Sequence, residues 1–159
     1  MVIGIGGLSR AGKTSLAEKL ADYYGREKVT ILHQDDFVNP EDEIPKIHDR
    51  IDWEHPASMN FKGLIQAIKN SDTGIVIVEG ILVFFNSDLR SLFDKKILLE
   101  IDKPTFLDRR HQENRWGHEP EWFIQHVWGS YWKYGRPENL DEYILIKQNQ
   151  ELAFDDLEL

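Results

Sequence analysis

The segment from Gly7 to Thr14 constrains the fold of this chain more than any other stretch. It reads Gly-Leu-Ser-Arg-Ala-Gly-Lys-Thr and fits the pattern G-x-x-x-x-G-K-[ST]. An apolar run at residues 2–5 precedes it, and a helical pattern at residues 15–24 follows it. This order of strand, loop and helix is the context in which the pattern indicates a phosphate-binding loop.

The residue types of this loop match the needs of a bound nucleotide triphosphate. Glycines allow the backbone N–H groups to point at phosphate oxygens, and the following helix adds the positive end of its dipole. Lys13 can reach the β- and γ-phosphates, and the Thr14 hydroxyl can bind Mg²⁺. The residues expected to bind ATP here are Gly7, Ser9, Arg10, Ala11, Gly12, Lys13, Thr14 and Ser15.

The composition narrows the class of protein further. A chain of 159 residues is the size of one domain with a real core. The net charge of -9, without a basic stripe, argues against nucleic-acid binding, and the lack of cysteine excludes disulfides and cysteine-based zinc sites. No stretch reads as a signal peptide or a membrane span, so we expect a soluble cytoplasmic protein with no membrane partner. The oligomeric state is left open.

Five short runs rich in valine and isoleucine predict β-strands at residues 2–5, 29–32, 75–78, 96–101 and 143–146. Helical patterns separate them. Ser58 is the expected cap of a helix through residues 61–68, Pro104 begins a helix that runs to about residue 114, and Pro120 begins one that ends near Gly135. Alternating strands and helices predict a single α/β domain over residues 1–159, with a parallel sheet covered on both faces.

Ligands of open parallel sheets bind beyond the carboxyl ends of the strands, so the residues that follow each strand should converge. Asp35 follows the second strand, and Glu79 ends the third. We expect Asp35 to accept the proton of a substrate hydroxyl and to contact Mg²⁺, and Glu79 to organise the same ion. Asp35 read alone would be an ordinary turn residue, and it is the nearby phosphate loop that favours a functional role.

Three arginines after the fourth strand, Arg109, Arg110 and Arg115, form a basic cluster in an acidic chain. Their guanidinium groups suit phosphate oxygens, although a solvated helix face is the simpler explanation for such a run. The following residues to Pro120 resemble a lid, with Gly117 as a hinge, which would exclude water from the reaction. The lid is therefore expected around residues 109–120.

Two further segments carry candidate residues. In the irregular stretch around Asp52, this carboxylate can accept hydrogen bonds from two sugar hydroxyls, whereas His55 before Pro56 is expected to stabilise a turn. Aromatic residues recur at helical spacing between residues 122 and 132, which indicates core packing with one ring left to stack on a substrate. The six histidines show no spacing typical of a metal site.

Four segments in order resemble the uridine kinase superfamily: the loop at residues 7–14, Gln-Asp-Asp-Phe at 34–37, Ile-Val-Glu-Gly-Ile-Leu at 77–82 and the arginines at 109–110. Within that superfamily the chain is most similar to nicotinamide riboside kinases, through residues 40–44 and the His-Val-Trp segment at 126–128. The resemblance extends from the first strand to about Tyr134. It implies a sheet of strand order 2-3-1-4-5.

The resemblance also implies roles for individual residues. Arg109 and Arg115 would face ATP, and the substrate side would comprise Asp36, Phe37, Asp52, Arg110 and Trp116, with Asp52 on the ribose hydroxyls. Ile51 departs from the pattern, because the nicotinamide riboside kinases commonly have an aromatic residue there to cover the pyridinium ring. The lid is also shorter, with Trp116 in place of its aromatic residue, and Gln148 and Asn149 are the candidates for contact with adenine.

The function predicted from these observations is transfer of the ATP γ-phosphate to the 5′-hydroxyl of a nucleoside, with Mg²⁺ as cofactor and nicotinamide riboside as the first choice. Uridine or cytidine is the alternative, followed by another small alcohol such as pantothenate. A nucleotide-binding regulator without an acceptor substrate is an alternative of a different class. A protein whose tryptophan-rich helix forms an interface is a third.

Overall fold

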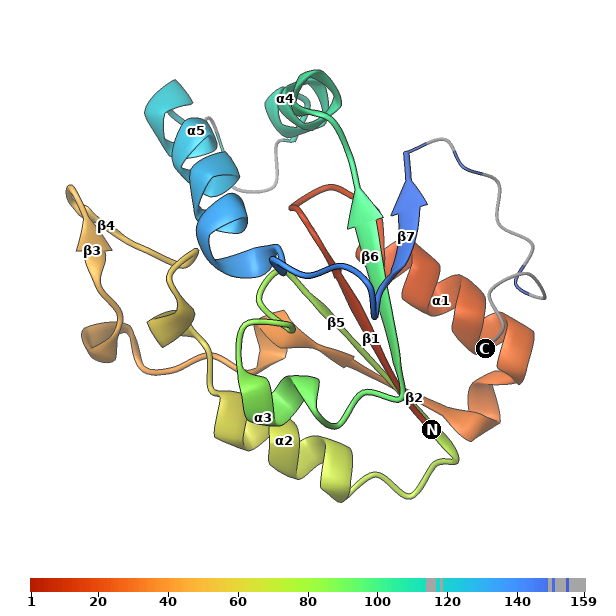
Figure 1. Ribbon diagram of the computed structural model, residues 1–159. Helices are drawn as coiled ribbons and strands as arrows, with labels where there is room; N and C mark the ends of the chain where they lie inside the picture. The colour runs from red at the N-terminus through yellow and green to blue at the C-terminus, as the bar shows by residue number, and fades with distance from the viewer. Residues whose placement is uncertain (114–116, 118, 149, 151–153, 155–159) are drawn as a thin grey trace.

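Five parallel strands form the centre of the molecule. The computed structural model describes residues 1–113, 117, 119–148, 150 and 154. The sheet comprises β1 (Val2–Gly7), β2 (Val29–His33), β5 (Ile75–Gly80), β6 (Lys95–Glu100) and β7 (Ile144–Lys147). Its spatial order is β2-β5-β1-β6-β7 (Figure 1), which confirms the predicted order 2-3-1-4-5 for the five strands.

Helices cover both faces of the sheet, as expected. Helix α1 (Lys13–Tyr24) packs on one face, whereas α2 (Phe61–Lys69) and α3 (Ser87–Arg90) pack on the other (Figure 1). Helices α4 (Lys103–His111) and α5 (Glu121–Ser130) share a separate apolar cluster with Leu8, near the carboxyl ends of the strands. A π-helical turn, η5 (Tyr131–Gly135), continues α5.

The alternation of residues in β1 explains how the two faces are filled. Ile3 and Ile5 point toward α1 and are fully buried. Gly4 and Gly6 point to the opposite face, where the Phe84 ring lies so close that a Cβ on either glycine would collide with it. Burial of these side chains on both faces holds β1 at the centre of the sheet, directly below the phosphate loop.

The cap of helix α2 differs from our prediction. Asn60 is the cap, because its side-chain oxygen accepts a hydrogen bond from the Gly63 N–H at 2.9 Å. Ser58, the predicted cap, lies in a 3₁₀ turn, η4 (Pro56–Ser58), and its hydroxyl donates to the Trp53 carbonyl at 2.9 Å. The helix begins two residues later than the sequence pattern indicated, so the expectation for Ser58 was wrong.

Some short elements carried no periodic signal in the sequence. They include a hairpin of two-residue strands, β3 (Lys46–Ile47) and β4 (Arg50–Ile51). The remaining 3₁₀ turns are η1 (Arg26–Lys28), η2 (Gln34–Asp36) and η3 (Glu41–Glu43). The hairpin stands beside α5 (Figure 1), and a cation–π contact of 5.8 Å joins Arg50 to the Phe123 ring.

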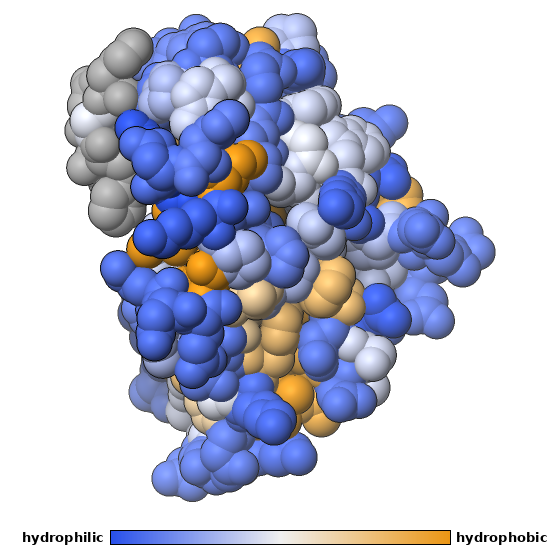
Figure 2. Space-filling view, turned by 90° about the vertical axis from the view of Figure 1, so that its left-hand side faces the viewer, coloured by the Kyte–Doolittle hydropathy of each residue, from blue (hydrophilic) through white to orange (hydrophobic). Residues whose placement is uncertain are grey.

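The surface on the side of this hairpin is largely hydrophilic, with one group of adjoining apolar residues in the middle and lower part of the view and smaller apolar spots above it (Figure 2). Across the whole described surface, the exposed aromatic side chains include Trp53, Phe85, Trp122 and Trp132. In the ranges that the structure describes, no helix has the length and apolar character needed to cross a membrane.

Candidate active site

The phosphate loop has the backbone geometry that its glycines predict. Gly7 has a φ of 149° and Gly12 a φ of 98°, so both occupy regions that favour glycine. A Cβ on Gly7 would lie 2.7 Å from the Leu99 carbonyl oxygen, whereas a Cβ on Gly12 would meet no described atom within 4 Å. The loop therefore packs tightly against β6 on one side and opens into free space at Gly12, before the start of α1.

Lys13 lies beneath this loop and is buried. Its Nζ donates a hydrogen bond to the Leu8 carbonyl at 3.1 Å, and this is the only bond of that ammonium group among the described residues. Burial lowers the pKa of Lys13, while the charges of Glu79, Asp35 and Glu54 oppose that shift. An ammonium group has three donors, so Lys13 retains two for phosphate oxygens.

Glu79 links the phosphate loop to the neighbouring strand. It is 7% exposed and pairs in the sheet register with Ile5 of β1 and His33 of β2. Its Oε1 accepts a hydrogen bond from the Thr14 hydroxyl at 3.0 Å and lies 2.8 Å from Nδ1 of His33. The sheet thus places Glu79 beside the residue expected to bind Mg²⁺. The contribution of His33 was not predicted, because a histidine at a strand end gives no specific signal.

The turn that carries Asp35 is fixed by the residue before it. Gln34 is buried, and its Oε1 accepts a hydrogen bond from the Leu82 N–H at 2.6 Å. The Gln34 side chain lies directly over Gly80, where a Cβ would collide with it. Turn η2 is thereby attached to the segment that follows β5, and Asp35 is held at the edge of the sheet beside Glu79.

Asp35 itself is exposed at the surface, but neighbouring protein atoms displace part of its water. This desolvation raises the pKa of Asp35, the charge of Lys13 opposes the rise, and the charges of Glu79 and Asp36 reinforce it. The carboxylate therefore lies within electrostatic reach of the Lys13 ammonium. Asp36 is exposed, whereas Phe37 is half-buried and packs against the apolar cluster of α2 and β5.

Arg109 and Arg10 form the outer part of the loop. Arg109 donates a hydrogen bond from its guanidinium to the Arg10 carbonyl at 3.0 Å. Arg10 has a φ of 67°, and its side chain pairs with Glu113 at 2.6 Å. The end of α4 is therefore attached to the phosphate loop by two polar contacts, which places Arg109 against the loop expected to bind ATP.

Arg110, the next residue of α4, makes more polar contacts than Arg109 does. Its guanidinium pairs with both oxygens of Glu119, at 2.7 and 2.8 Å, and donates to the Ser9 hydroxyl at 2.8 Å. Such two-pronged pairs are among the strongest that a carboxylate makes. Glu119 was not identified from the sequence, because a glutamate in an expected lid has no specific pattern.

The predicted lid falls partly outside the described residues. Arg115 and Trp116 lie there, together with residues 114 and 118. Asn149, a candidate for adenine contact, lies outside as well. Gly117, the expected hinge, has a φ of 75°.

Asp52 is buried at the end of the hairpin, on the side of α5. Its Oδ1 lies 2.7 Å from Nε2 of His126 and accepts a hydrogen bond from the Glu54 N–H at 3.2 Å. The Ser130 hydroxyl lies 3.3 Å from the same histidine nitrogen. The other carboxylate oxygen of Asp52 makes no hydrogen bond within the part of the chain that the structure describes. His126 was read from the sequence as a core residue, since its neighbours show helical apolar spacing.

Glu54 is a second acid in this region that sequence reasoning did not select. It is half-buried, and burial raises its pKa to about 7; the charges of Asp52 and Asp35 add to the rise, whereas Arg110 and His126 oppose it. Glu54 is therefore electrostatically coupled to both the phosphate loop and the hairpin. His55 accepts a hydrogen bond from the Ala57 N–H at 3.1 Å, which confirms its predicted role in a turn.

The donors around Thr14 have the chemistry that Mg²⁺ requires. The Thr14 hydroxyl and the Glu79 and Asp35 carboxylates are all hard oxygen ligands. No cluster of three or more histidine, cysteine or acidic side chains suited to a metal ion occurs in the described ranges.

Comparison with known proteins gives one consistent result. No family model matches the chain. Human nicotinamide riboside kinase 2 is 26% identical, over 84% of this chain and 67% of its own length. A uridine kinase of Chlamydia pneumoniae is 29% identical, over 69% of this chain and 62% of its own length. The chain thus spans about two thirds of the length of these two curated relatives.

A solved structure shows the same fold. The protein, described as a possible uridine kinase from Bacillus stearothermophilus, superimposes with a TM-score of 0.57 at 19% identity, over 91% of this chain and 88% of that one. The chain is similar in sequence to nicotinamide riboside kinases and uridine kinases, and it has the fold of a P-loop kinase.

Proposed function

We propose that this chain is an ATP- and Mg²⁺-dependent kinase that phosphorylates the 5′-hydroxyl of a nucleoside, with nicotinamide riboside as the preferred acceptor. The observation that carries the proposal is the geometry at one edge of the sheet, where the Thr14 hydroxyl next to the buried Lys13 donates to Glu79 at 3.0 Å and the turn η2 presents Asp35. Cation and acids are what phosphoryl transfer needs to neutralise the phosphates and to receive a proton. The similarity to nicotinamide riboside and uridine kinases supports the choice of acceptor class.

In the proposed reaction, the loop N–H groups and Lys13 hold the β- and γ-phosphates of ATP. The acceptor oxygen forms a bond to the γ-phosphorus as the bond to the bridging oxygen of ADP breaks, and Asp35 takes the hydroxyl proton. Its raised pKa makes the Asp35 carboxylate a better proton acceptor than an ordinary aspartate. Arg109 lies against the loop, where it can bind the phosphate oxygens, and Arg110, which is bonded to Ser9 and Glu119, would lie near the acceptor.

Mg²⁺ would be held by Thr14, Glu79 and Asp35, and when bound it neutralises phosphate charge. The Thr14 hydroxyl donates to Glu79, and His33 contacts the same oxygen. In this arrangement Glu79 orients the threonine, and the histidine restrains the glutamate. The lid, proposed for residues 109–120 of a single kinase domain, would exclude water from the transfer.

The acceptor side, which we define as Asp52, Glu54 and His126, favours a cationic substrate. Asp52 has one oxygen bound to His126 and one without a described partner, which suits the ribose hydroxyls. Glu54 adds a second acid, and the charges that oppose the rise of its pKa are those of Arg110 and His126, while Lys13 also attracts this carboxylate. The pyridinium ring of nicotinamide riboside would supply a positive charge to this acidic surface, whereas uridine and cytidine are neutral. Because a uridine kinase is among the similar proteins, uridine and cytidine are the second choice of acceptor.

The decisive assay measures phosphate transfer from ATP to nicotinamide riboside, uridine, cytidine and pantothenate with the purified chain. We expect kcat/KM to be highest for nicotinamide riboside. A preference for uridine or cytidine would refute the assignment of the base while leaving a nucleoside kinase. Transfer to pantothenate alone would refute the nucleoside assignment.

The role of Asp35 has its own test. Asp35→Asn should lower kcat by about 10²- to 10⁴-fold, because the proton acceptor is lost, while ATP binding at saturating Mg²⁺ persists. Asp42→Asn, an exposed acid nearby, is the matched control and should retain full turnover. ATP binding by the unmodified chain without transfer to any acceptor would instead favour the nucleotide-binding regulator.

A further inference from the structure

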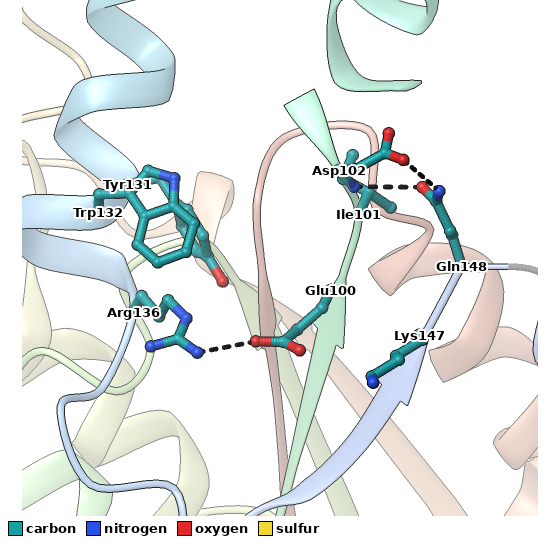
Figure 3. A pocket seen from close by; sticks show the side chains of 8 residues that line it. All are labelled: Glu100, Ile101, Asp102, Tyr131, Trp132, Arg136, Lys147 and Gln148. Atoms are coloured by element: carbon teal, nitrogen blue, oxygen red, sulfur yellow. Dashed lines mark hydrogen bonds and ion pairs between the residues drawn. The ribbon is translucent and has the colours of Figure 1, made fainter. Parts of the chain in front are cut away.

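A cavity of about 270 Å³ lies apart from the phosphate loop, between strands β6 and β7 and the turn η5. Figure 3 shows Tyr131, Trp132 and Arg136 on one wall, Glu100 and Lys147 on the strands opposite, and Asp102 with Gln148 at the upper rim. None of these residues belongs to the phosphate loop or to the acceptor side, although Gln148 at the rim is also the described candidate for contact with adenine. The inference that follows does not depend on the proposed function.

The sheet register shows on which face this cavity lies. Glu100 and Lys147 are paired neighbours in β6 and β7. The alternating residues Leu99 and Ile146 point toward α1 and belong to its apolar cluster. Since successive side chains point to opposite faces, Glu100 and Lys147 point away from α1. The cavity is therefore on the face opposite the helix that follows the phosphate loop.

The acids of the cavity already have partners. Glu100 is paired with Arg136 at 3.0 Å rather than with its neighbour Lys147. Asp102 accepts hydrogen bonds from the Thr105 N–H at 2.8 Å and from the Gln148 amide at 2.8 Å. The negative charges around the cavity are thus largely satisfied within the protein.

The donors are not satisfied in the same way. Arg136 has a buried Nε without a hydrogen-bond partner, and Lys147 makes no ion pair within the described residues. The Tyr131 hydroxyl points into the cavity (Figure 3) and likewise has no described hydrogen bond. Burial raises the pKa of Tyr131, so this hydroxyl keeps its proton and can donate. The buried Nε of Arg136 is therefore unsatisfied, and the Tyr131 hydroxyl and the exposed Lys147 ammonium can donate to a ligand that is rich in acceptors.

Trp132 adds an aromatic surface to these donors. The indole is 49% exposed although it lines the cavity, and the Arg136 guanidinium lies 4.8 Å from its ring centroid. A planar ring can stack on an exposed indole, and a carboxylate can meet a lysine and a tyrosine at the same time. The volume is slightly below the range common for drug-sized ligands, so the ligand must be small.

We propose that this cavity is a binding site for a small aromatic carboxylate, whose ring stacks on Trp132 and whose carboxylate accepts hydrogen bonds from Lys147 and Tyr131. Both parts of the ligand are required: the cavity offers a flat apolar wall on η5 and a donor-rich wall formed by β7 and Tyr131. A neutral ring lacks the charge that Lys147 can bind, and a bare anion lacks the contact with the indole.

The experiment measures binding of benzoate to the whole chain by isothermal titration calorimetry, with benzamide as the uncharged isostere and inorganic phosphate as the anion without a ring. We expect one benzoate per chain with a Kd of about 1–10 mM, in line with its few heavy atoms, and about tenfold weaker binding of benzamide and of phosphate. Lys147→Met and Trp132→Ala should each weaken benzoate binding about tenfold.

Matched controls use residues outside the cavity. Lys62→Met, an exposed lysine on α2, and Trp122→Ala, an exposed tryptophan at the start of α5, should leave benzoate binding unchanged. Equal binding of benzoate and benzamide, equal binding of phosphate, or an unchanged Kd in Lys147→Met would each overturn the proposal. Displacement of benzoate by saturating ATP would also overturn it, because the ligand would then occupy the nucleotide site. Lys147 is exposed, so its variant tests the proposal even if Trp132→Ala fails to fold.

Discussion

The phosphate loop and the acceptor side are coupled by charge, but they are built in different ways. The loop, with Lys13 and Glu79, is positioned by the backbone of one strand, one helix and their parallel neighbours. Asp52 instead depends on a side-chain contact with His126, 74 residues further along the chain. The residues proposed for phosphoryl transfer are therefore positioned by adjacent strands of the sheet, whereas the residue proposed to bind the acceptor is positioned by contact with a helix outside the sheet.

The largest expected effect comes from the phosphate side. Lys13→Met should lower kcat/KM by about 10³-fold, because the γ-phosphate loses its buried cation. The folded state should be retained, since methionine fits the buried stem without the cost of desolvating an ammonium group. Steady-state kinetics with ATP and the acceptor, combined with thermal unfolding, measure both effects.

Lys19→Met, an exposed lysine on α1, is the control and should behave as the unmodified chain. If the turnover of Lys13→Met stays within tenfold of that of the unmodified chain, the loop amides and arginines suffice to stabilise the γ-phosphate. That result would refute the role assigned to Lys13.

A smaller effect is expected when the acceptor side is changed. Asp52→Ala should raise the acceptor KM by about 30- to 100-fold, because the ribose hydroxyls lose a charged acceptor, while the KM for ATP stays within twofold. Steady-state kinetics with each substrate varied in turn separate the two constants. Asp49→Asn, an exposed acid in the same hairpin, should change neither. Equal rises in both KM values would mean that the two regions are not separable.

Glu54 provides a pH-dependent test of the coupling between the two regions. Its pKa is about 7 in the folded chain, against 4.5 for an ordinary glutamate, so the folded state binds the proton more tightly. The contribution of Glu54 to the free energy of unfolding therefore falls as pH rises from about 4.5 to about 7. Above pH 7 the ionised carboxylate keeps this contribution low. Glu54→Gln should raise the free energy of unfolding by about 2 kcal/mol at pH 8 and by much less at pH 5.

Urea unfolding at the two pH values measures this difference, and Glu43→Gln, at an exposed position, should show none. A stabilisation of Glu54→Gln that is the same at both pH values would contradict a raised pKa and point to packing instead.

The smallest effect is expected far from both regions. Asn60→Ala should lower the free energy of unfolding by about 1 kcal/mol, because the Gly63 N–H at the start of α2 loses its acceptor. Asn60→Asp should restore most of this stability. At a temperature where both variants are folded, neither variant should change the KM for ATP or the KM for the acceptor. A change in either KM value would show that α2 shapes the site.

Sequence reasoning identified the groups whose positions follow from local patterns. The five apolar runs and the glycine-rich loop predict the sheet and place Glu79 at its edge, because parallel strands end together. The contact between His126 and Asp52 could not be predicted, since a histidine among aromatic residues at helical spacing is typical of a core. Ser58 and Asn60 both suit a helix cap, and only tertiary packing decides between them. Two-residue strands such as β3 and β4 are too short for any periodicity.

The Gln34 side chain over Gly80 has a consequence for how this sequence can vary. A larger residue at position 80 would push Gln34 aside, release the Leu82 N–H and displace the turn that bears Asp35. Homologues that differ at either of these two positions should therefore differ at both, so that residues 34 and 80 covary.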